Sequence, residues 1–230
     1  MGCWALETDW AAWGSMIQAG AAVAMVGIAI WGLNSWKTEL RGTKEQDLAE
    51  AVLAATYKYV AALSLVRTNS FASVSDMVAV ERRPHETDDE WNARQPFGTV
   101  EPRLEQYLMD DYVQLRALIF KVQALFSDAE VDAIRRLLDF VPRLRRAALA
   151  ASTAAVCRLH ADQELTKLSN ANGGFDPGLQ QLSDDWRDVI EEMSAILWEK
   201  TRDDTISKEI AEATRRIEGL MKGRASFSKP

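Results

Sequence analysis

The chain carries no charged side chain between Trp10 and Leu33, and this run limits its fold more than any other feature. At about 1.5 Å per residue, a helix from Trp13 to Trp31 rises about 27 Å, close to the thickness of the hydrocarbon core of a bilayer. A helix this apolar is buried either in a membrane or in protein. Its length favours a membrane span, which we predict within residues 1–36.

Tryptophans bracket the run on both sides. Indole rings concentrate at the level of the lipid headgroups, because they are apolar but carry one polar N–H. With the first two cations after the run, they form the predicted membrane-interface anchors: Trp10, Trp13, Trp31, Trp36, Lys37 and Arg41. Ala and Gly supply much of the apolarity and Gln18 opposes insertion. The competing interpretation is therefore a small-residue helix packed in a protein core or against another subunit.

The charges around the run predict its orientation. Glu7 and Asp9 precede it, whereas Lys37, Arg41 and Lys44 follow it. By the positive-inside rule, the amino terminus lies outside and the bulk of the chain lies in the cytoplasm, as in a single-pass protein of the bacterial inner (plasma) membrane. No basic residue precedes the run, so a retained anchor fits better than a cleaved signal peptide.

One face of the predicted span is lined by small residues. Gly20, Ala24 and Gly27 lie at i, i+4 and i+7, a spacing that lets a second helix approach closely. This face is a candidate for self-association, although Gly and Ala are also common in membrane helices without such a role. The expected partners are the lipid bilayer and either a homo-oligomer or another protein.

The rest of the chain has helical periodicity, with apolar residues every three or four positions and no strand-like alternation. We predict an all-α protein whose transmembrane helix continues into a cytoplasmic bundle of three or four long helices with coiled-coil-like packing. Gly42 and Thr43 mark the only plausible joint in the first helix. The predicted divisions are the tail and span (1–36), a helical extension (37–66), a loop (67–102), the helical bundle (103–222) and a disordered tail (223–230).

Local signals mark the helix ends inside the bundle. "SDAE" at Ser127 to Glu130 is typical of a capping box that starts a new helix. Pro142 should kink or split that helix, because proline removes one backbone hydrogen bond. Asp176 before Pro177 favours the start of a last helix, predicted to run to Lys222.

The composition and the motifs argue against nucleic-acid binding, metal binding and catalysis. With 27 Lys and Arg against 34 Asp and Glu, the net charge of -7 lacks the electrostatic footprint of a nucleic-acid-binding protein. His85 lies beside four carboxylates and could hold a hard divalent ion or act as a general base, but no second histidine, glycine turn or EF-hand spacing accompanies it, which favours a solvated acidic loop. Cys157 and His160, three residues apart, lack two further zinc ligands. We therefore predict no cofactor, no metal and no enzymatic activity.

One basic cluster stands out, "RRLLDFVPRLRR". Its cations can meet anionic lipid headgroups or an acidic partner, or can be ordinary solvated arginines beside an apolar stripe: Arg135, Arg136, Arg143, Arg145 and Arg146.

The junction after the span carries a pattern of its own, W-K-x-E-L-x-G followed by L-A-x-x-x-L-x-x-x-Y and an arginine. Its residues are Trp36, Lys37, Glu39, Leu40, Gly42, Leu48, Ala49, Leu53, Tyr57, Arg67 and Phe71. The first third of the chain thereby resembles a group of uncharacterised bacterial and phage or genomic-island single-pass membrane proteins. Thr68, Asn69 and Ser70 stand where such proteins often have Asn-Pro. The resemblance implies a membrane-anchored helical protein and no particular activity.

We therefore expect a non-enzymatic, membrane-anchored scaffold or sensor that presents helical surfaces to a partner. One alternative is a membrane effector of the kind used in host–phage conflict, acting by self-association through the small-residue face. A weaker alternative is a metal-dependent enzyme built on His85 and its neighbouring carboxylates.

Overall fold

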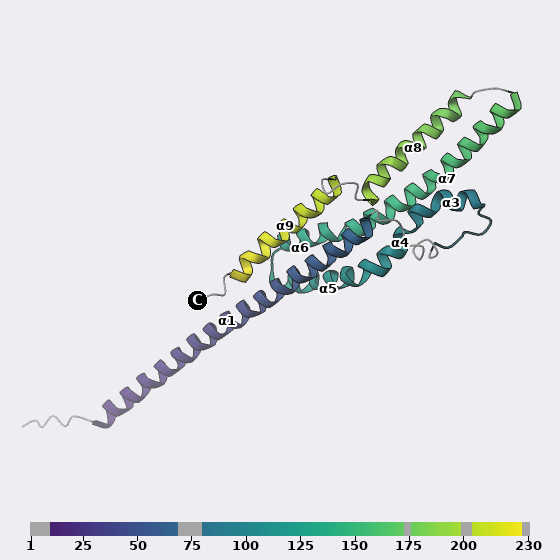
Figure 1. Cartoon of the computed structure of the whole chain (residues 1–230). Coiled ribbons are helices and arrows are strands. Elements are labelled where there is room, and N and C mark those ends of the chain that lie inside the picture. The colour runs from purple at the N-terminus through teal and green to yellow at the C-terminus, as the bar shows by residue number, and fades with distance from the viewer. Residues whose placement is uncertain (1–9, 69–79, 173–175, 199–203, 227–230) are drawn as a thin grey trace, which may run out of the picture.

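The computed structural model describes residues 10–68, 80–172, 176–198 and 204–226, with side chains from residue 24 onward. No strand occurs among these residues, and the prediction of an all-α protein is confirmed (Figure 1). The elements are α1 (Trp10–Arg67), α3 (Asp88–Gly98), α4 (Val100–Arg103), the π-helical turn η1 (Leu104–Leu108), α5 (Met109–Leu125), α6 (Asp128–Leu138), α7 (Phe140–Asn172), α8 (Pro177–Leu197) and α9 (Thr205–Ser226).

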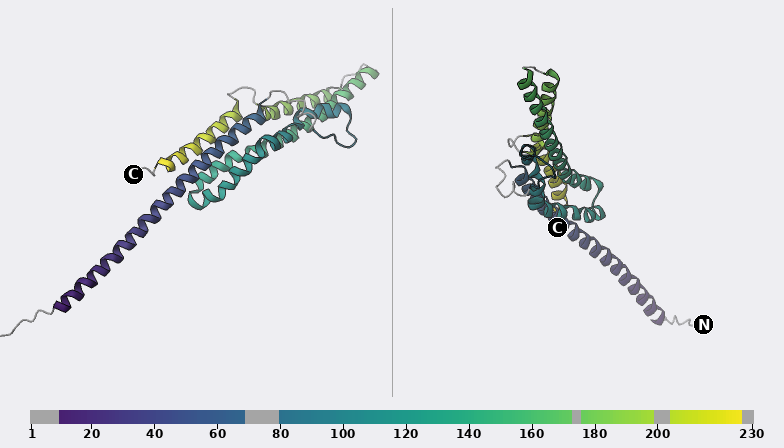
Figure 2. Two further views of the ribbon diagram at one scale, coloured as in Figure 1. Left: turned by 60° about the horizontal axis from the view of Figure 1, so that its bottom comes forward. Right: turned by 90° about the vertical axis from the view of Figure 1, so that its right-hand side faces the viewer.

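The longest element, α1, is a single helix of 58 residues that joins the apolar run to the bundle. It passes through Gly42 without a break, so the expected joint is absent. A Cβ atom at Gly42 would meet nothing within 4 Å, which places this glycine on a free surface of the helix. The amino-terminal half of α1 projects away from the other helices, and its carboxy-terminal half lies among them (Figures 1 and 2).

The core is built around the second half of α1, which packs against α5 and α9, while α6 packs against both of those helices. Burial in α1 begins at Leu48 and recurs with helical spacing: Leu48, Ala49, Val52, Ala55, Tyr59, Ala62, Leu63 and Val66. Tyr59 is fully buried, and its hydroxyl donates to the carbonyl of Leu137 at 3.2 Å. That hydrogen bond offsets the cost of placing a polar group in the core.

An arm extends beyond the core, formed by α7 and α8 running antiparallel (Figure 1). The carboxylate of Asp176 starts α8 by accepting from the backbone N–H groups of Gly178 (2.8 Å) and Leu179 (3.2 Å), as the sequence predicts. Helix α3 packs on α7 at the base of the arm.

The predicted loop at 67–102 is wrong from Asp88 onward, where α3 and α4 form. Thr87 and Glu90 make a capping box, in which Glu90 N–H donates to the Thr87 hydroxyl and Thr87 N–H donates to the Glu90 carboxylate. This cap starts α3, and Pro96 lies in its last turn, where it removes one backbone hydrogen bond; the helix ends two residues later, at Gly98. Residues 69–79 of the predicted loop lie outside the described residues.

Two long predicted helices are each divided. The capping box at Ser127 and Glu130 is present, and the helix that it starts is split near Pro142, as predicted: it ends at Leu138, and α7 begins two residues later. Pro142 therefore lies in the first turn of α7, where its missing N–H needs no intrahelical partner. The predicted last helix is two helices, α8 and α9. Helix α9 continues to Ser226, so the tail predicted to be disordered from residue 223 starts as helix.

Two buried arginines fasten the end of α1. The Arg67 guanidinium donates to the Ile196 carbonyl at the end of α8 (3.2 Å) and binds Asp204 at 2.8 Å. Arg103 donates to the carbonyls of Val66 (3.4 Å) and Thr68 (3.2 Å). Both cations thus satisfy carbonyls that helix ends leave without a partner.

Arg67→Met should lower the free energy of unfolding by about 3 kcal/mol, because it leaves the Asp204 carboxylate and the Ile196 carbonyl without their buried partner. Arg41→Met is the matched control: Arg41 also pairs with a carboxylate, Glu45, but at the surface of α1, where the loss should be under about 0.5 kcal/mol. Denaturant unfolding of the full chain in detergent, followed by circular dichroism, measures both. Equal losses for the two variants would contradict the role assigned to Arg67.

Candidate functional site

The first candidate site is the projecting half of α1. Every side chain described from Ala24 to Arg41 is exposed, and these include Met25, Val26, Ile28, Ile30 and Leu33. An apolar surface exposed around the whole circumference of a helix is far larger than soluble monomers normally show. This segment therefore has the surface of a helix that is covered by something outside the monomer.

By length and composition, α1 can cross a membrane, and an 18-residue stretch of it has a mean hydropathy of 1.3. Of that stretch, 44% is buried. Because 44% of eighteen residues is eight, and burial in α1 begins at Leu48, this stretch itself lies in the half of the helix that is in the bundle. The candidate membrane span is instead the exposed half, which begins in the charge-free run.

The predicted interface anchors whose side chains the structure describes are exposed on the projecting half of α1. Trp31 and Trp36 are 74% and 58% exposed, and Lys37 and Arg41 follow them on the exposed segment. Arg41 donates to Glu45 at 2.9 Å, one turn further on. The side chains of Trp10 and Trp13 lie outside the described residues.

The predicted self-association face points to the same side of α1 as the bundle. Thirty-six residues make about ten turns of a helix with 3.6 residues per turn, so Gly20, Ala24 and Gly27 align with Thr56, Val60 and Leu63. Thr56 and Leu63 are fully buried, and Val60 packs against the core. A Cβ at Gly27 would meet nothing within 4 Å, and Ala24 is exposed. A parallel pair of α1 helices joined by this face would direct both bundles into the space between them.

The acidic segment around His85 is organised by arginines. The Arg94 guanidinium forms two hydrogen bonds with the Glu86 carboxylate, at 2.6 and 2.8 Å, and both side chains are buried. Arg82 pairs with Asp88 at 2.6 Å. His85 lies in a turn at φ 66°, closed by a hydrogen bond from Glu86 N–H to the Arg83 carbonyl. These carboxylates hold the segment together, and the described residues contain no group of three or more side chains suited to a metal.

Cys157 and His160 lie on α7 beneath α3. The His160 ring nitrogen Nε2 is 2.7 Å from the Glu90 carboxylate, the same carboxylate that caps α3. Cys157 is half-buried and unoxidised. His160 is therefore positioned as a contact between α3 and α7, a role that the spacing of the pair does not indicate.

Most of the basic cluster is paired within the chain. Arg145 binds Glu101 through two hydrogen bonds at 2.6 and 3.0 Å, and Arg143 binds Glu209 at 2.6 Å. Arg135 contacts Asp132 at 3.5 Å. The first two pairs connect α7 to α4 and to α9, and the third lies within α6, so the cluster serves largely as intramolecular contacts.

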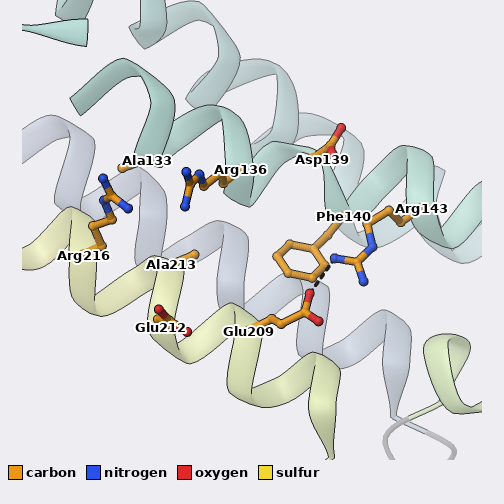
Figure 3. Close-up of a pocket in the computed structure, with 9 residues that line it drawn as sticks. All are labelled: Ala133, Arg136, Asp139, Phe140, Arg143, Glu209, Glu212, Ala213 and Arg216. Carbon is orange, nitrogen blue, oxygen red and sulfur yellow. Dashed lines mark hydrogen bonds and ion pairs between the residues drawn. The ribbon is translucent and has the colours of Figure 1, made fainter. Parts of the chain in front are cut away.

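A cleft of about 270 Å³ lies between α9 and the junction of α6 with α7 (Figure 3). Arg143 crosses it, lying 5.0 Å from the centroid of Phe140 and bonded to Glu209. The three arginines of its lining are matched by three carboxylates, and no histidine, cysteine or serine lines it. This charge-balanced cleft offers no nucleophile and no general base other than carboxylates.

No family model, no curated protein and no solved structure matches this chain. The candidate site therefore has to be judged on the geometry of its own residues. The residues that sequence reasoning missed are the buried arginines. Arg94 gives no sequence signal, whereas Arg67 directly follows an apolar stripe with helical spacing and could have been recognised by that position.

The Glu86–Arg94 pair should make stability depend on acid pH. The hydrogen bonds from Arg94 lower the pKa of Glu86 to about 2, well below its ordinary value of about 4.3. Between these values the unfolded chain binds more protons than the folded chain, so the pair stabilises fully above about pH 5 and its contribution is lost as the pH falls towards 2.

Glu86→Gln should therefore reduce the loss of stability between about pH 6 and about pH 3, measured by denaturant unfolding at both pH values. Glu105→Gln, which alters an exposed carboxylate on η1, is the control. An unchanged pH dependence in Glu86→Gln would contradict the assigned pairing.

Proposed function

We propose that this chain is a single-pass membrane protein whose cytoplasmic helical bundle is a non-enzymatic interaction module, a scaffold or sensor. The observation that carries the proposal is the division of α1. One continuous helix has an apolar half exposed on all sides and a second half that is the centre of a core. Burying a large apolar side chain is worth about 1.5–3 kcal/mol, so a bilayer around the exposed half is strongly favoured over water.

In this arrangement the bundle begins at a defined distance from the membrane surface. Trp36 is the last tryptophan among the predicted interface anchors, and Leu48 is the first buried residue of α1, twelve residues later. At about 1.5 Å per residue the bundle begins about 18 Å beyond the interface. This distance leaves room for a partner beside the exposed segment of α1, and the arm of α7 and α8 extends away from the projecting half of α1 (Figure 1).

The acidic and histidine side chains that could bind a metal or act as a general base are engaged in structural contacts. Glu86 and Glu90 are bound to Arg94 and to the cap of α3, and His160 contacts Glu90. This supports an interaction module over a metal-dependent enzyme built on His85. The alignment of the small-residue face with the bundle likewise weighs against the effector alternative, which depends on self-association through that face.

The membrane anchor is tested by alkaline extraction of membranes that contain the full chain. The wild type should remain in the pellet. Met25→Arg should move a substantial fraction into the supernatant or into aggregates, because Met25 is the large described apolar residue nearest the middle of the run and an arginine at the centre of a span costs about 2.5–3.5 kcal/mol. Leu149→Arg is the matched control, since Leu149 is an equally exposed apolar residue on α7. Extraction of the wild type, or equal behaviour of the two variants, would refute the anchor.

The two native cysteines report the orientation. In Cys157→Ser, an impermeant maleimide added to intact spheroplasts should label Cys3; in Cys3→Ser, half-buried Cys157 should react only after permeabilisation. The reverse pattern would place the bundle outside the cell.

A further inference from the structure

We propose that the cleft between α9 and the junction of α6 with α7 binds the phosphate group of a small, soluble phosphate monoester. Arg136 of α6 and Arg216 of α9, which line this cleft, would hold the group between them (Figure 3). A bound ligand of this kind would make the bundle a sensor rather than only a scaffold. The proposal rests on the proposed membrane anchor in one respect, the exclusion of lipid phosphate.

The charges of the cleft are balanced in number but not in their pairing. Arg143 and Glu209 are bound to each other at 2.6 Å. The guanidinium groups of Arg136 and Arg216 form neither an ion pair nor a hydrogen bond with any part of the chain that the structure describes. Each of these guanidinium groups has five N–H donors, and all of them are available to a ligand.

The two unpaired guanidinium groups lie together although a carboxylate is close to each in sequence. Asp139 follows Arg136 by three residues. Glu212 precedes Arg216 by four. Opposite charges at these spacings on a helix commonly pair. Figure 3 instead shows both guanidinium groups at one end of the cleft, with the two carboxylates directed elsewhere. Two like charges on facing helices repel each other, and an anion bound between them replaces that repulsion with attraction.

A phosphate monoester suits this pair of cations better than a phosphate diester or a carboxylate. The monoester carries a charge of about −1.5 to −2 at neutral pH and three acceptor oxygens, so its charge matches that of two arginines. The planar fork of an arginine binds two phosphate oxygens at once, and forks on two facing helices can hold one group from both sides. The cleft volume of about 270 Å³ is small for a ligand site, which favours a small molecule.

The cleft lies too far along α1 to reach the phosphates of the anchoring bilayer. Arg136 directly precedes Leu137, whose carbonyl accepts from the hydroxyl of Tyr59 on α1. Tyr59 follows Trp36, a predicted interface anchor, by 23 residues, or about 35 Å at about 1.5 Å per residue. This distance is several times the screening length of about 8 Å at physiological salt. The phosphate group must therefore come from a soluble molecule.

A ligand at this position would act on the packing of the core. Helix α6 packs against α9, and α9 packs against the second half of α1. A phosphate group bound by one arginine from α6 and one from α9 adds a link across the contact between these helices. A soluble compound would thereby stabilise the part of the bundle that is built on the membrane helix.

Calorimetric titration of the full chain in phosphatidylcholine nanodiscs tests the site, with methyl phosphate as the monoester and dimethyl phosphate as the diester. Methyl phosphate should bind saturably at a single site per chain and several-fold more tightly than dimethyl phosphate. Arg136→Met and Arg216→Met should each weaken the binding of methyl phosphate at least about tenfold, because each removes charged hydrogen bonds. Arg215→Met is the matched control and should leave the affinity nearly unchanged, since Arg215 is an exposed neighbour on α9 that does not line the cleft.

Anionic lipid distinguishes the two sources of phosphate. Adding phosphatidate to the nanodiscs should leave the affinity for methyl phosphate unchanged, and competition by this lipid would overturn the soluble ligand. The absence of saturable binding, equal binding of the two esters, or equal losses in Arg215→Met and Arg136→Met would each overturn the phosphate site. Unfolding temperatures without ligand should be the same in all variants, because both cleft arginines are exposed and unpaired. A chain that failed to enter nanodiscs would refute the anchor alone, and the same titration in detergent would then test the cleft.

Discussion

The unbroken backbone of α1 is the constraint on which the rest of the structure depends. Its second half contributes eight buried apolar residues to the core, and the four leucines and valines among them are each worth about 1.5–3 kcal/mol on burial. That sum is comparable to the whole net stability of a typical domain, about 5–15 kcal/mol. The bundle therefore has no stable core without α1. If the first half of the helix lies in a membrane, the bundle is anchored there too, because its core is built on the second half of the same helix.

The far end of α1 is fixed by hydrogen bonds to buried arginines. A helix leaves its last four carbonyls without intrahelical partners, and burying them unpaired is costly. Arg103 meets this need at the end of α1, and Arg67 meets it at the end of α8. Arg67 also binds Asp204, whose carboxylate accepts from Ser207 N–H at the start of α9. Three helix ends are thereby joined by two side chains.

Much of this fold could be predicted from periodicity and caps. The length of α1, the capping box at Ser127 and the Asp176 cap all follow from local rules, because each depends only on residues within a turn or two. The start of α3 has the same kind of signal, Thr87 followed by Glu90, but the prolines and carboxylates around it favoured a loop. Local patterns alone do not show that α9 is a separate helix, since the packing of α9 against α1 and α6 involves residues distant in sequence.

The candidate interaction site shows a further limit of local reasoning. The spacing of Gly20, Ala24 and Gly27 identifies a small-residue face, but its meaning depends on the direction in which the bundle lies, and that direction is set by contacts thirty-six residues away.

Only the continuity of α1 allows the two directions to be compared. In an unbroken helix, the spacing between two residues determines whether they lie on the same side, because each residue adds a rotation of about 100° about the helix axis. Gly27 and Leu63 consequently share a side, and Ala29 shares the opposite side with Leu65. The side left open carries a less regular mixture of alanine, methionine, leucine and charged residues. The side with the more evident packing motif is thus the side occupied by the bundle.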